Sequence, residues 1–305
     1  MGRLAIIVPV HHLPKAPMLL ISLLSCSSSK NTATSSDTPK ETTPFTEVKA
    51  CDDPSFNLSD EAKNALTNVG FTQCLMPFDI LIGADQEIPS RYVGLTAQIL
   101  AELLDPDQDG TPNDPQVLAE LQLGTNAWLA MPSDSEKWDN EQVPVLQQVL
   151  GYDIIIPTWW MGNTSSSEPS KHVKAVMVEE VTHFITQFGW SPVYPEQFGV
   201  MSWDSIIAQE TKSAACEWWQ HPENSCPDSP QQTPGNCTHP SCDVVEFYHQ
   251  VLIMRAGMEP AWLGIGFPDN AETLESLLSD ELKSLMDNPQ YHQPQTPLSF
   301  TYGEE

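Results

Sequence analysis

Glu179, Glu180 and His183 lie close together within one largely apolar stretch of the chain, Lys171–Gly189. The stretch has the length of a helix of about five turns. At about 100° per residue, Glu180 falls inside a broad apolar face, His183 just beyond its edge and Glu179 further towards the polar side. Ionisable side chains in an apolar surrounding are costly unless they are paired or bind a metal. The pattern therefore predicts a functional site on this helix.

The segment Glu179-Glu180-Val181-Thr182-His183 resembles the HExxH motif of zincin metallopeptidases, with Glu in place of the first His. In that family the two outer residues bind zinc from one helix face and the middle Glu acts on the bound water. The resemblance implies that Glu179 and His183 are metal ligands and that Glu180 is the general base of a peptidase. Because a carboxylate replaces an imidazole, the metal preference shifts towards harder ions. We expect Zn²⁺ or another divalent transition metal as the cofactor, and a peptide or protein as the substrate.

A further metal ligand is expected from later in the chain. Glu246 is the first candidate, because it lies in a nearly all-apolar predicted helix where an unpaired carboxylate is costly. Glu210 is the second, since it resembles the downstream helical Glu that completes gluzincin sites. A hydrogen bond from Glu246 to His249, Tyr248 or the backbone is the alternative that involves no metal.

Two other interpretations of the same residues stay open. Glu180 with His183, and Glu246 with His249, both follow the pattern Glu-x-x-His, and Glu210 lies on a predicted helix between them. This resembles the ligand pattern of ferritin-like di-iron proteins, although predicted strands argue against a four-helix bundle. Alternatively, Glu180 and His183 pair only with each other and fix the helix in place. The protein would then be a non-catalytic surface protein.

A second candidate site lies in the acidic segment DPDQDGTPND, Asp105–Asp114. Its alternating acids and its glycine resemble the calcium loops of EF-hands and of thrombospondin type 3 repeats. Ca²⁺ takes about six to eight oxygen ligands. The twelfth loop position is Gln116 instead of the bidentate Glu of an EF-hand, so we expect weak affinity or completion by Asp114. The ligands expected for this structural Ca²⁺ site are Asp105, Asp107, Asp109, Thr111, Asn113 and Asp114.

The charge balance narrows the classes of partner. The chain has 41 acidic and 13 basic residues and a formal net charge of −28. Nucleic acids and anionic membrane surfaces require basic patches, so neither is expected as a partner. The sequence also contains no G-x-S-x-G motif and no Gly-rich phosphate loop. Divalent cations remain the ligands that the composition favours.

The N-terminus has the features of an export signal. Arg3 and Lys15 precede a short apolar run that ends in Leu-Leu-Ser-Cys. This resembles the bacterial lipoprotein signal, in which the cysteine, here Cys26, becomes the lipidated first residue. We expect a signal peptide over 1–26, a disordered Ser/Thr/Pro-rich linker over 27–50, and membrane contact only through a lipid anchor. The protein would be a cell-envelope lipoprotein, or a secreted protein if the signal is an ordinary one.

Six cysteines remain after Cys26, and an even number in an exported chain indicates three disulfides. A Cys51–Cys74 bridge and local closure within 216–242 are the expected pairings. Zinc binding by these cysteines is disfavoured, because no C-x2-C pair is present.

The elements that must position these residues give an α+β fold, mostly helical with a small sheet and stapled by disulfides. A strand, a loop and then the Glu/His helix is similar to zincin organisation. We expect one domain over 51–286, followed by a Pro/Gln-rich tail over 287–305. Helical periodicity and strand composition predict eight helices, 60–68, 91–104, 115–123, 143–150, 171–189, 204–219, 242–255 and 272–286, and three strands, 78–83, 126–131 and 153–157.

Overall fold

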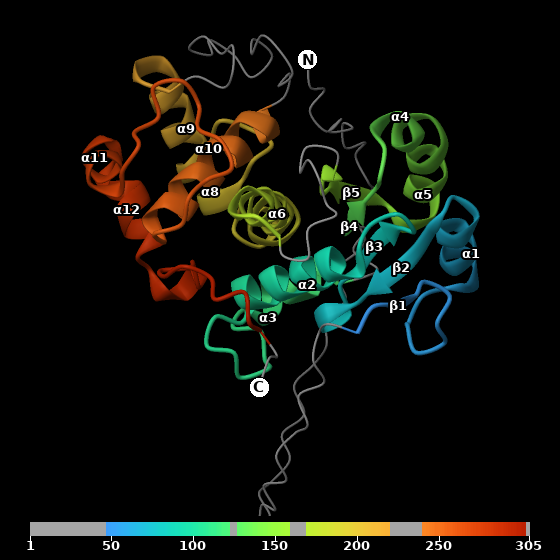
Figure 1. The fold of residues 1–305 in the computed structure, drawn as a ribbon. Coiled ribbons are helices and arrows are strands. Elements are labelled where there is room, and N and C mark those ends of the chain that lie inside the picture. The colour runs from blue at the N-terminus through green and yellow to red at the C-terminus, as the bar shows by residue number, and fades with distance from the viewer. Residues whose placement is uncertain (1–46, 123–126, 159–168, 220–239, 303–305) are drawn as a thin grey trace, which may run out of the picture.

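The computed structural model describes residues 47–122, 127–158, 169–219 and 240–302. The fold is α+β, as predicted, with one open sheet of five strands on one side of the molecule and a group of helices beside it (Figure 1). The expected signal segment with Cys26, and the linker up to residue 46, lie outside the described residues.

The sheet has the strand order β1-β2-β3-β4-β5. The first two pairings are antiparallel and the last two are parallel. The strands are β1 (Lys49–Ala50), β2 (Phe71–Leu75), β3 (Ile82–Asp85), β4 (Ala127–Met131) and β5 (Tyr152–Ile155). Because Lys49 pairs with Cys74, the folded part begins before residue 51, where the linker was expected to end.

One predicted strand is wrong in its extent, and β2 was not predicted. Residues 78–83 were expected to form a single strand, but Pro77–Asp79 is a 3-10 turn and β3 begins at Ile82. Phe78 and Asp79 have positive φ angles of 51° and 62°. This tight turn reverses the chain, so that Leu75 pairs with Ile82 in antiparallel register.

The predicted helices are present, most of them with ends within two residues of the expected ones. The main helices are α1 (Asp60–Asn68), α2 (Ser90–Leu104), α3 (Pro115–Leu121), α5 (Val143–Leu150), α6 (Lys171–Ile185), α9 (Ile206–Glu217), α10 (Pro240–Arg255), α11 (Ala271–Leu277) and α12 (Asp280–Met286). Short helices α4 (Ser135–Lys137), α7 (Ser191–Val193) and α8 (Pro195–Phe198) connect them.

The single helix predicted over 272–286 is a pair of helices, α11 and α12. Leu278 is extended, and the Ser279 hydroxyl accepts a hydrogen bond from the Leu282 N–H as the N-cap of α12. A serine cap satisfies a backbone donor that a continuous helix would pair internally. Ser170 caps α6 in the same way, at the Val173 N–H.

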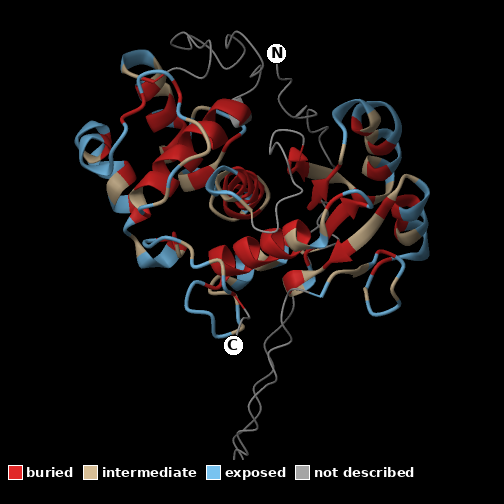
Figure 2. Ribbon diagram, in the orientation of Figure 1, coloured by how far each residue is buried: buried red, intermediate tan, exposed pale blue. Residues whose placement is uncertain are grey.

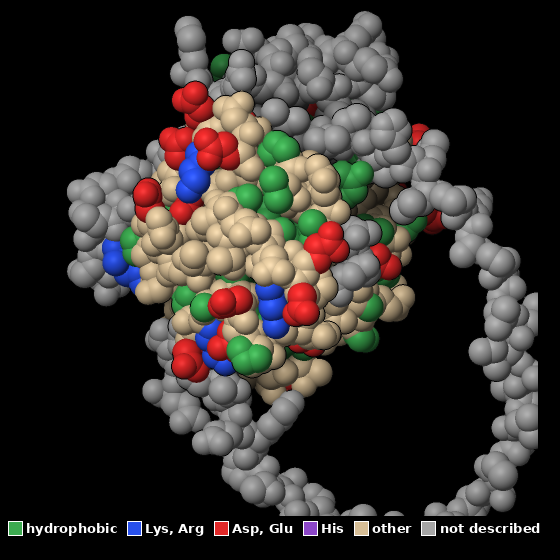
Figure 3. All heavy atoms as spheres, turned by 90° about the vertical axis from the view of Figure 1, so that its right-hand side faces the viewer, with side chains coloured by type: hydrophobic (Ala, Val, Ile, Leu, Met, Phe, Trp, Pro, Cys, Tyr) green, Lys and Arg blue, Asp and Glu red, His purple; other side chains and the backbone are tan. Residues whose placement is uncertain are grey.

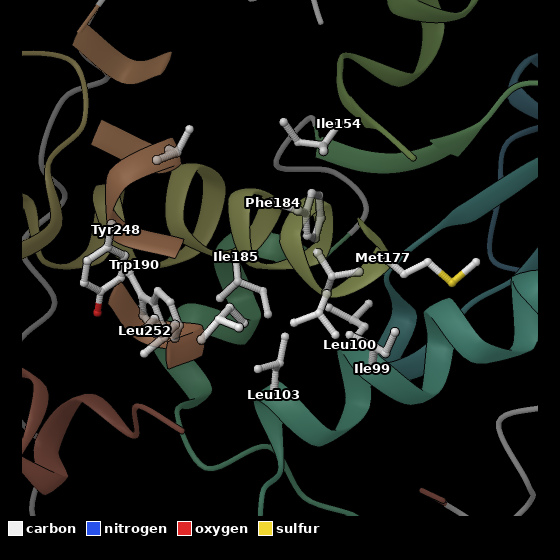
Figure 4. Close-up of a cluster of buried hydrophobic side chains, with 14 of the residues drawn as sticks. Ile99, Leu100, Leu103, Ile154, Met177, Phe184, Ile185, Trp190, Tyr248 and Leu252 are labelled. Atoms are coloured by element: carbon white, nitrogen blue, oxygen red, sulfur yellow. The ribbon is translucent and has the colours of Figure 1, made fainter. Parts of the chain in front are cut away.

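Helix α6 lies at the centre of the molecule, between α2 and α10 (Figure 1). Figure 4 shows apolar side chains that pack around α6, among them Leu100 and Leu103 of α2 and Leu252 of α10. Figure 2 shows α6 buried along most of its length, whereas α11 at the edge is largely exposed. Burial on several sides explains why Glu179, Glu180 and His183 of α6 are also buried.

One apolar cluster lies between the sheet and helices α2 and α6. A second apolar cluster lies on the opposite face of the sheet, beneath α1 and α5 (Figure 1). Trp128 and Phe71 are fully buried in it. The predicted Cys51–Cys74 disulfide lies in this cluster and ties the first strands together. Cys216 and Cys242 are also disulfide-bonded, while Cys226 and Cys237 lie outside the described residues.

The C-terminal segment is not a free tail as far as residue 302. Tyr291 and Tyr302 are buried, and residues 299–302 contact the end of α2. Within the described part of the chain, no helix is long and apolar enough to cross a membrane. Figure 3 shows acidic side chains scattered over one face, with a few basic ones among them, so the excess negative charge does not gather in one patch there.

Candidate metal centre

Helices α6 and α10 bring four potential metal ligands together. Glu179 and His183 come from α6, and Glu246 and His249 come from α10. One ligand atom from each residue lies within 4.8 Å of the others. All four residues are buried, with exposed fractions between 1% and 6%. Three of the four predicted ligands are therefore grouped, and His249 completes the set.

The distances within the group suit a single ion. His183 Nε2 lies 2.9 Å from His249 Nδ1, and Glu246 Oε2 lies 3.6 Å from each of these nitrogens. On the far side, His249 Nε2 is 3.9 Å from Glu179 Oε1. Two ligand atoms bound tetrahedrally at normal zinc distances lie about 3.4 Å apart. The two 3.6 Å separations are close to that length, the 2.9 Å separation is shorter, and the 3.9 Å separation involves the other ring nitrogen of His249.

Two further side chains contact the ligands from outside the group. Glu180 Oε2 lies 3.3 Å from His183 Nδ1, the ring nitrogen that does not face the other ligands. Trp262 donates a hydrogen bond from Nε1 to Glu179 Oε1 at 2.7 Å. The contact between Glu180 and His183 was expected only in the interpretation without a metal, and the Trp262 contact was not predicted from the sequence.

Burial sets the protonation of the group. It raises the pKa of Glu179 well above its usual range, with a further contribution from the nearby Glu180. It also raises the pKa of Glu180 to about 8. Burial lowers the pKa of His183, although Glu246 acts in the opposite direction. A neutral imidazole is the form that binds a metal, and a cation would offset the cost of burying carboxylates.

Glu210 lies outside the group formed by Glu179, His183, Glu246 and His249. Its Oε1 accepts a hydrogen bond from the Ser279 N–H at 3.1 Å, which connects α9 to the start of α12. It is not part of the metal-ligating group formed by the described residues. The buried position of Glu210 thus has a structural explanation.

His249 was identifiable from its spacing to Glu246, but only within the di-iron interpretation. In the metallopeptidase interpretation the further ligand was expected to be a carboxylate, so His249, one turn after Glu246, was not proposed as a ligand. The di-iron interpretation paired His183 with Glu180, whereas the structure groups it with Glu179. The group has the size of one ion, whereas two-metal sites hold ions about 3.5–4 Å apart, each with its own ligands.

The acidic loop between α2 and α3 forms a second group. Ligand oxygens of Asp105, Asp107 and Asp109 lie within 4.8 Å of one another. Asp105 is fully buried, and its Oδ2 accepts hydrogen bonds from the Gly110 N–H at 2.8 Å and from the Tyr302 hydroxyl. A side-chain hydrogen bond with Asp105 raises the pKa of Asp107, and desolvation and the negative charges of Asp109 and Asp105 add to this effect. A bound cation relieves the repulsion between the carboxylates.

Two oxygens beside this group are buried and have no hydrogen-bond partner in the described part of the chain, Asp105 Oδ1 and Asn113 Oδ1. Thr111 donates its N–H to Asp109 Oδ1 at 2.8 Å. Asp114 caps α3 through the Gln116 N–H and also accepts a hydrogen bond from Tyr194 at 2.6 Å. Asp114 therefore holds α3 and does not belong to the three-carboxylate group.

No protein-family model, curated protein or solved structure matches the chain.

Proposed function

We propose that this protein binds one divalent transition-metal ion through Glu179, His183, Glu246 and His249. One observation supports this above all: four buried ligand atoms from two neighbouring helices lie within 4.8 Å of one another. Four ionisable side chains buried in this way are costly without an ion between them.

The donor atoms indicate the class of metal. Imidazole nitrogens suit Zn²⁺, Fe²⁺ and neighbouring first-row ions, whereas Ca²⁺ and Mg²⁺ prefer oxygen ligands alone. Two imidazoles with two carboxylates, and no sulfur, therefore favour Zn²⁺ or another divalent first-row ion. Zn²⁺ is the first ion to test, because its usual protein ligands include both donor types.

Metal analysis of the purified protein tests this proposal. We expect about one equivalent of metal after reconstitution with Zn²⁺, and its loss in His183→Ala and in His249→Ala. His172→Ala is the matched control, because His172 lies on the same helix but is exposed. Equal metal content in all four proteins would refute the site.

For the reaction, we propose metal-dependent hydrolysis of a peptide bond. Its support is the resemblance to the zincin motif, together with the placement of Glu179 and His183 one turn apart and of Glu246 beside them. A bound Zn²⁺ ion supplies a water of lowered pKa. His183→Ala should abolish hydrolysis of an unstructured protein substrate. A metal-loaded protein without any hydrolytic activity would favour the alternative, a non-catalytic surface protein.

The role of Glu180 follows from its contact with His183 Nδ1. We propose that Glu180 orients this imidazole, in place of the general-base role that the motif implies. Histidine ligands commonly donate their second ring N–H to a carboxylate, which fixes the ring and its tautomer. The 3.3 Å separation between Glu180 Oε2 and His183 Nδ1 supports a contact of this kind.

We also propose that the loop over residues 105–113 binds Ca²⁺ as a structural ion. The two buried oxygens without partners, Asp105 Oδ1 and Asn113 Oδ1, favour this beyond the clustering of acids. Ca²⁺ should raise the melting temperature, since an ion that binds only the folded state stabilises it. Asp107→Ala/Asp109→Ala should remove the shift, and no shift in the parent protein would contradict the proposal.

We also propose that the protein is exported as a lipoprotein. The Cys51–Cys74 disulfide is compatible with an oxidising compartment. Metabolic labelling with a fatty acid should modify the parent chain and not Cys26→Ser, and an unlabelled parent chain would favour an ordinary secretory signal.

A further inference from the structure

Trp262 reaches the metal-ligating group from a loop that the motif does not include. Its indole Nε1 donates a hydrogen bond to Glu179 Oε1 at 2.7 Å. Its ring lies 6.2 Å from the His249 ring, centroid to centroid. An indole N–H is a donor only, so its natural partner is a carboxylate oxygen. Trp262 thus contacts one candidate ligand by a hydrogen bond and lies beside a second.

The loop that bears Trp262 is anchored to α10 and approaches the Trp218 backbone closely. On the C-terminal side, the Gly264 N–H donates to Gln250 Oε1 of α10 at 3.0 Å. Gly266 has a φ of +82°, and a Cβ at this position would lie 1.9 Å from the Trp218 carbonyl oxygen. Only glycine permits that approach. Gln250 is fully buried in the helix that also provides Glu246 and His249.

The apolar end of the loop adds a further anchor. Phe267 is buried, and its ring packs against those of Phe247 and Trp218 at centroid distances of 6.2 and 5.7 Å. Phe247 follows Glu246 directly in α10. The position of the indole is therefore set by contacts with the same helix that supplies two of the ligands.

We propose that Trp262 is a positioning residue of the metal centre, which fixes the carboxylate of Glu179 in its binding orientation. This inference rests on the proposed metal site. A glutamate side chain has several rotatable bonds, and ordering it costs conformational entropy when the ion binds. A hydrogen bond from a fixed indole orders the carboxylate in advance. Partners of this kind are worth about 10- to 100-fold in metal affinity.

Trp262→Phe tests the proposal, because it keeps an aromatic ring and removes the N–H. Zn²⁺ affinity, measured by competition with a chromogenic chelator, should fall by about 10- to 100-fold. Trp203→Phe is the matched control. Trp203 is half-buried like Trp262, and its Nε1 has no hydrogen-bond partner in the described part of the chain. The Zn²⁺ affinity of Trp203→Phe should stay within about twofold of the parent value.

A double-mutant cycle separates positioning from a general loss of structure. If Trp262 acts through Glu179, Trp262→Phe should cost little further affinity in a Glu179→Gln background. Additive losses would overturn the inference, as would an unchanged Zn²⁺ affinity in Trp262→Phe. The visible spectrum of the Co²⁺-loaded protein should also change in Trp262→Phe and not in Trp203→Phe. If the parent protein binds neither Zn²⁺ nor Co²⁺, the proposed function itself is refuted.

Discussion

At the scale of residues, His183 is the candidate ligand with contacts to both of its ring nitrogens. Its Nε2 faces His249 and Glu246, and its Nδ1 faces Glu180. For Nε2 to bind a metal, the ring proton must be on Nδ1, where a Glu180 carboxylate accepts it. The Glu180 contact is therefore compatible with the tautomer that a metal at Nε2 requires.

Replacement of Glu180 distinguishes an orienting role from a general base. In Glu180→Gln we expect Zn²⁺ affinity to fall by about tenfold or more, because the amide is a weaker acceptor for the Nδ1 proton. Titration against a competing chelator measures it. Full affinity combined with lost hydrolysis would instead assign Glu180 to the chemistry of the bound water.

A second buried acid, Asp85, provides a prediction that is independent of any metal. Burial alone would raise the pKa of Asp85, but hydrogen bonds from Lys137, Gln142 and Ser133 outweigh it and hold the pKa below its usual value. In Lys137→Met, we expect a loss of about 1–3 kcal/mol in the free energy of unfolding. The lysine is 34% exposed, which places the effect towards the lower end.

The pH dependence of this effect has a definite sign. Because the folded-state pKa of Asp85 is lowered, its stabilising contribution is present above the unfolded pKa of about 3.9 and is lost as pH falls below it. The difference in stability between the parent and Lys137→Met should therefore be full at pH 6 and shrink below about pH 4. Urea denaturation across this range measures it, and a gap that widens in acid would contradict the assignment.

Sequence reasoning located the residues of one helix better than it located their partners. The position of Glu180 in an apolar face and the cost of burying Glu246 are local signals, and both acids are buried. Trp262 has no such signal, because its contact with Glu179 joins residues 83 positions apart. Glu210 was wrongly expected to be a metal ligand because it is an acid on a helix. Its carboxylate instead accepts a hydrogen bond from the Ser279 N–H, a contact that no sequence spacing indicates.

At the scale of elements, the continuation of α6 connects the two candidate sites. The helix widens into a π-helical turn over Thr186–Trp190, and Gly189 in this turn packs against α3. A Cβ on Gly189 would lie 2.9 Å from Val117 Cγ1 and 3.2 Å from Leu121 Cδ1. Helix α3 begins directly after the acidic loop, so the small residue allows that loop and the Glu/His helix to share one packed unit.

Gly189→Ala should therefore overpack this contact. We expect a loss of about 1–3 kcal/mol in the free energy of unfolding, as is typical when a methyl group is forced into a packed core. Chemical denaturation measures it. The double variant Gly189→Ala/Val117→Ala should recover part of the loss relative to the sum of the single changes. A neutral or stabilising effect of Gly189→Ala would show that α3 is not packed in this way.

Helices were predicted better than strands for a physical reason. Helical periodicity and caps such as Ser59 and Ser170 are local, and α1 and α5 match their predicted bounds. β2 and β3 depend on a turn in which Phe78 and Asp79, rather than glycine, adopt positive φ. That conformation is stabilised by the strand pairing itself, which the sequence alone does not reveal.

At the scale of the whole molecule, residues 299–302 contact the end of α2 and the start of the acidic loop. Glu102 is buried and accepts hydrogen bonds from the Ser299 N–H, the Ser299 hydroxyl and the Thr301 N–H, at 2.6, 2.9 and 2.9 Å. Phe300 packs under Lys174 of α6, with 4.4 Å from the ammonium to the ring centroid. Residues treated as a tail from their composition are thus part of the fold.

Glu102→Ala should release this segment. We expect at least about 2 kcal/mol of destabilisation, since hydrogen bonds to a charged group are among the stronger ones. Amide exchange at Ser299 and Thr301 should also accelerate. Glu87→Ala, at an exposed acid, is the control. Unchanged exchange at both residues in Glu102→Ala would contradict the proposed anchoring.

The central claim is that α6 and α10 together bind one metal ion with nitrogen and oxygen ligands. X-ray absorption spectroscopy of the Zn²⁺-loaded protein tests it most directly. We expect a first shell of nitrogen and oxygen at about 2.0–2.1 Å, with the outer-shell signal of two imidazoles and no sulfur. In His249→Ala the signal should fall to one imidazole or the ion should be lost. A sulfur-containing shell, or a spectrum unchanged by His183→Ala and His249→Ala, would contradict the assignment.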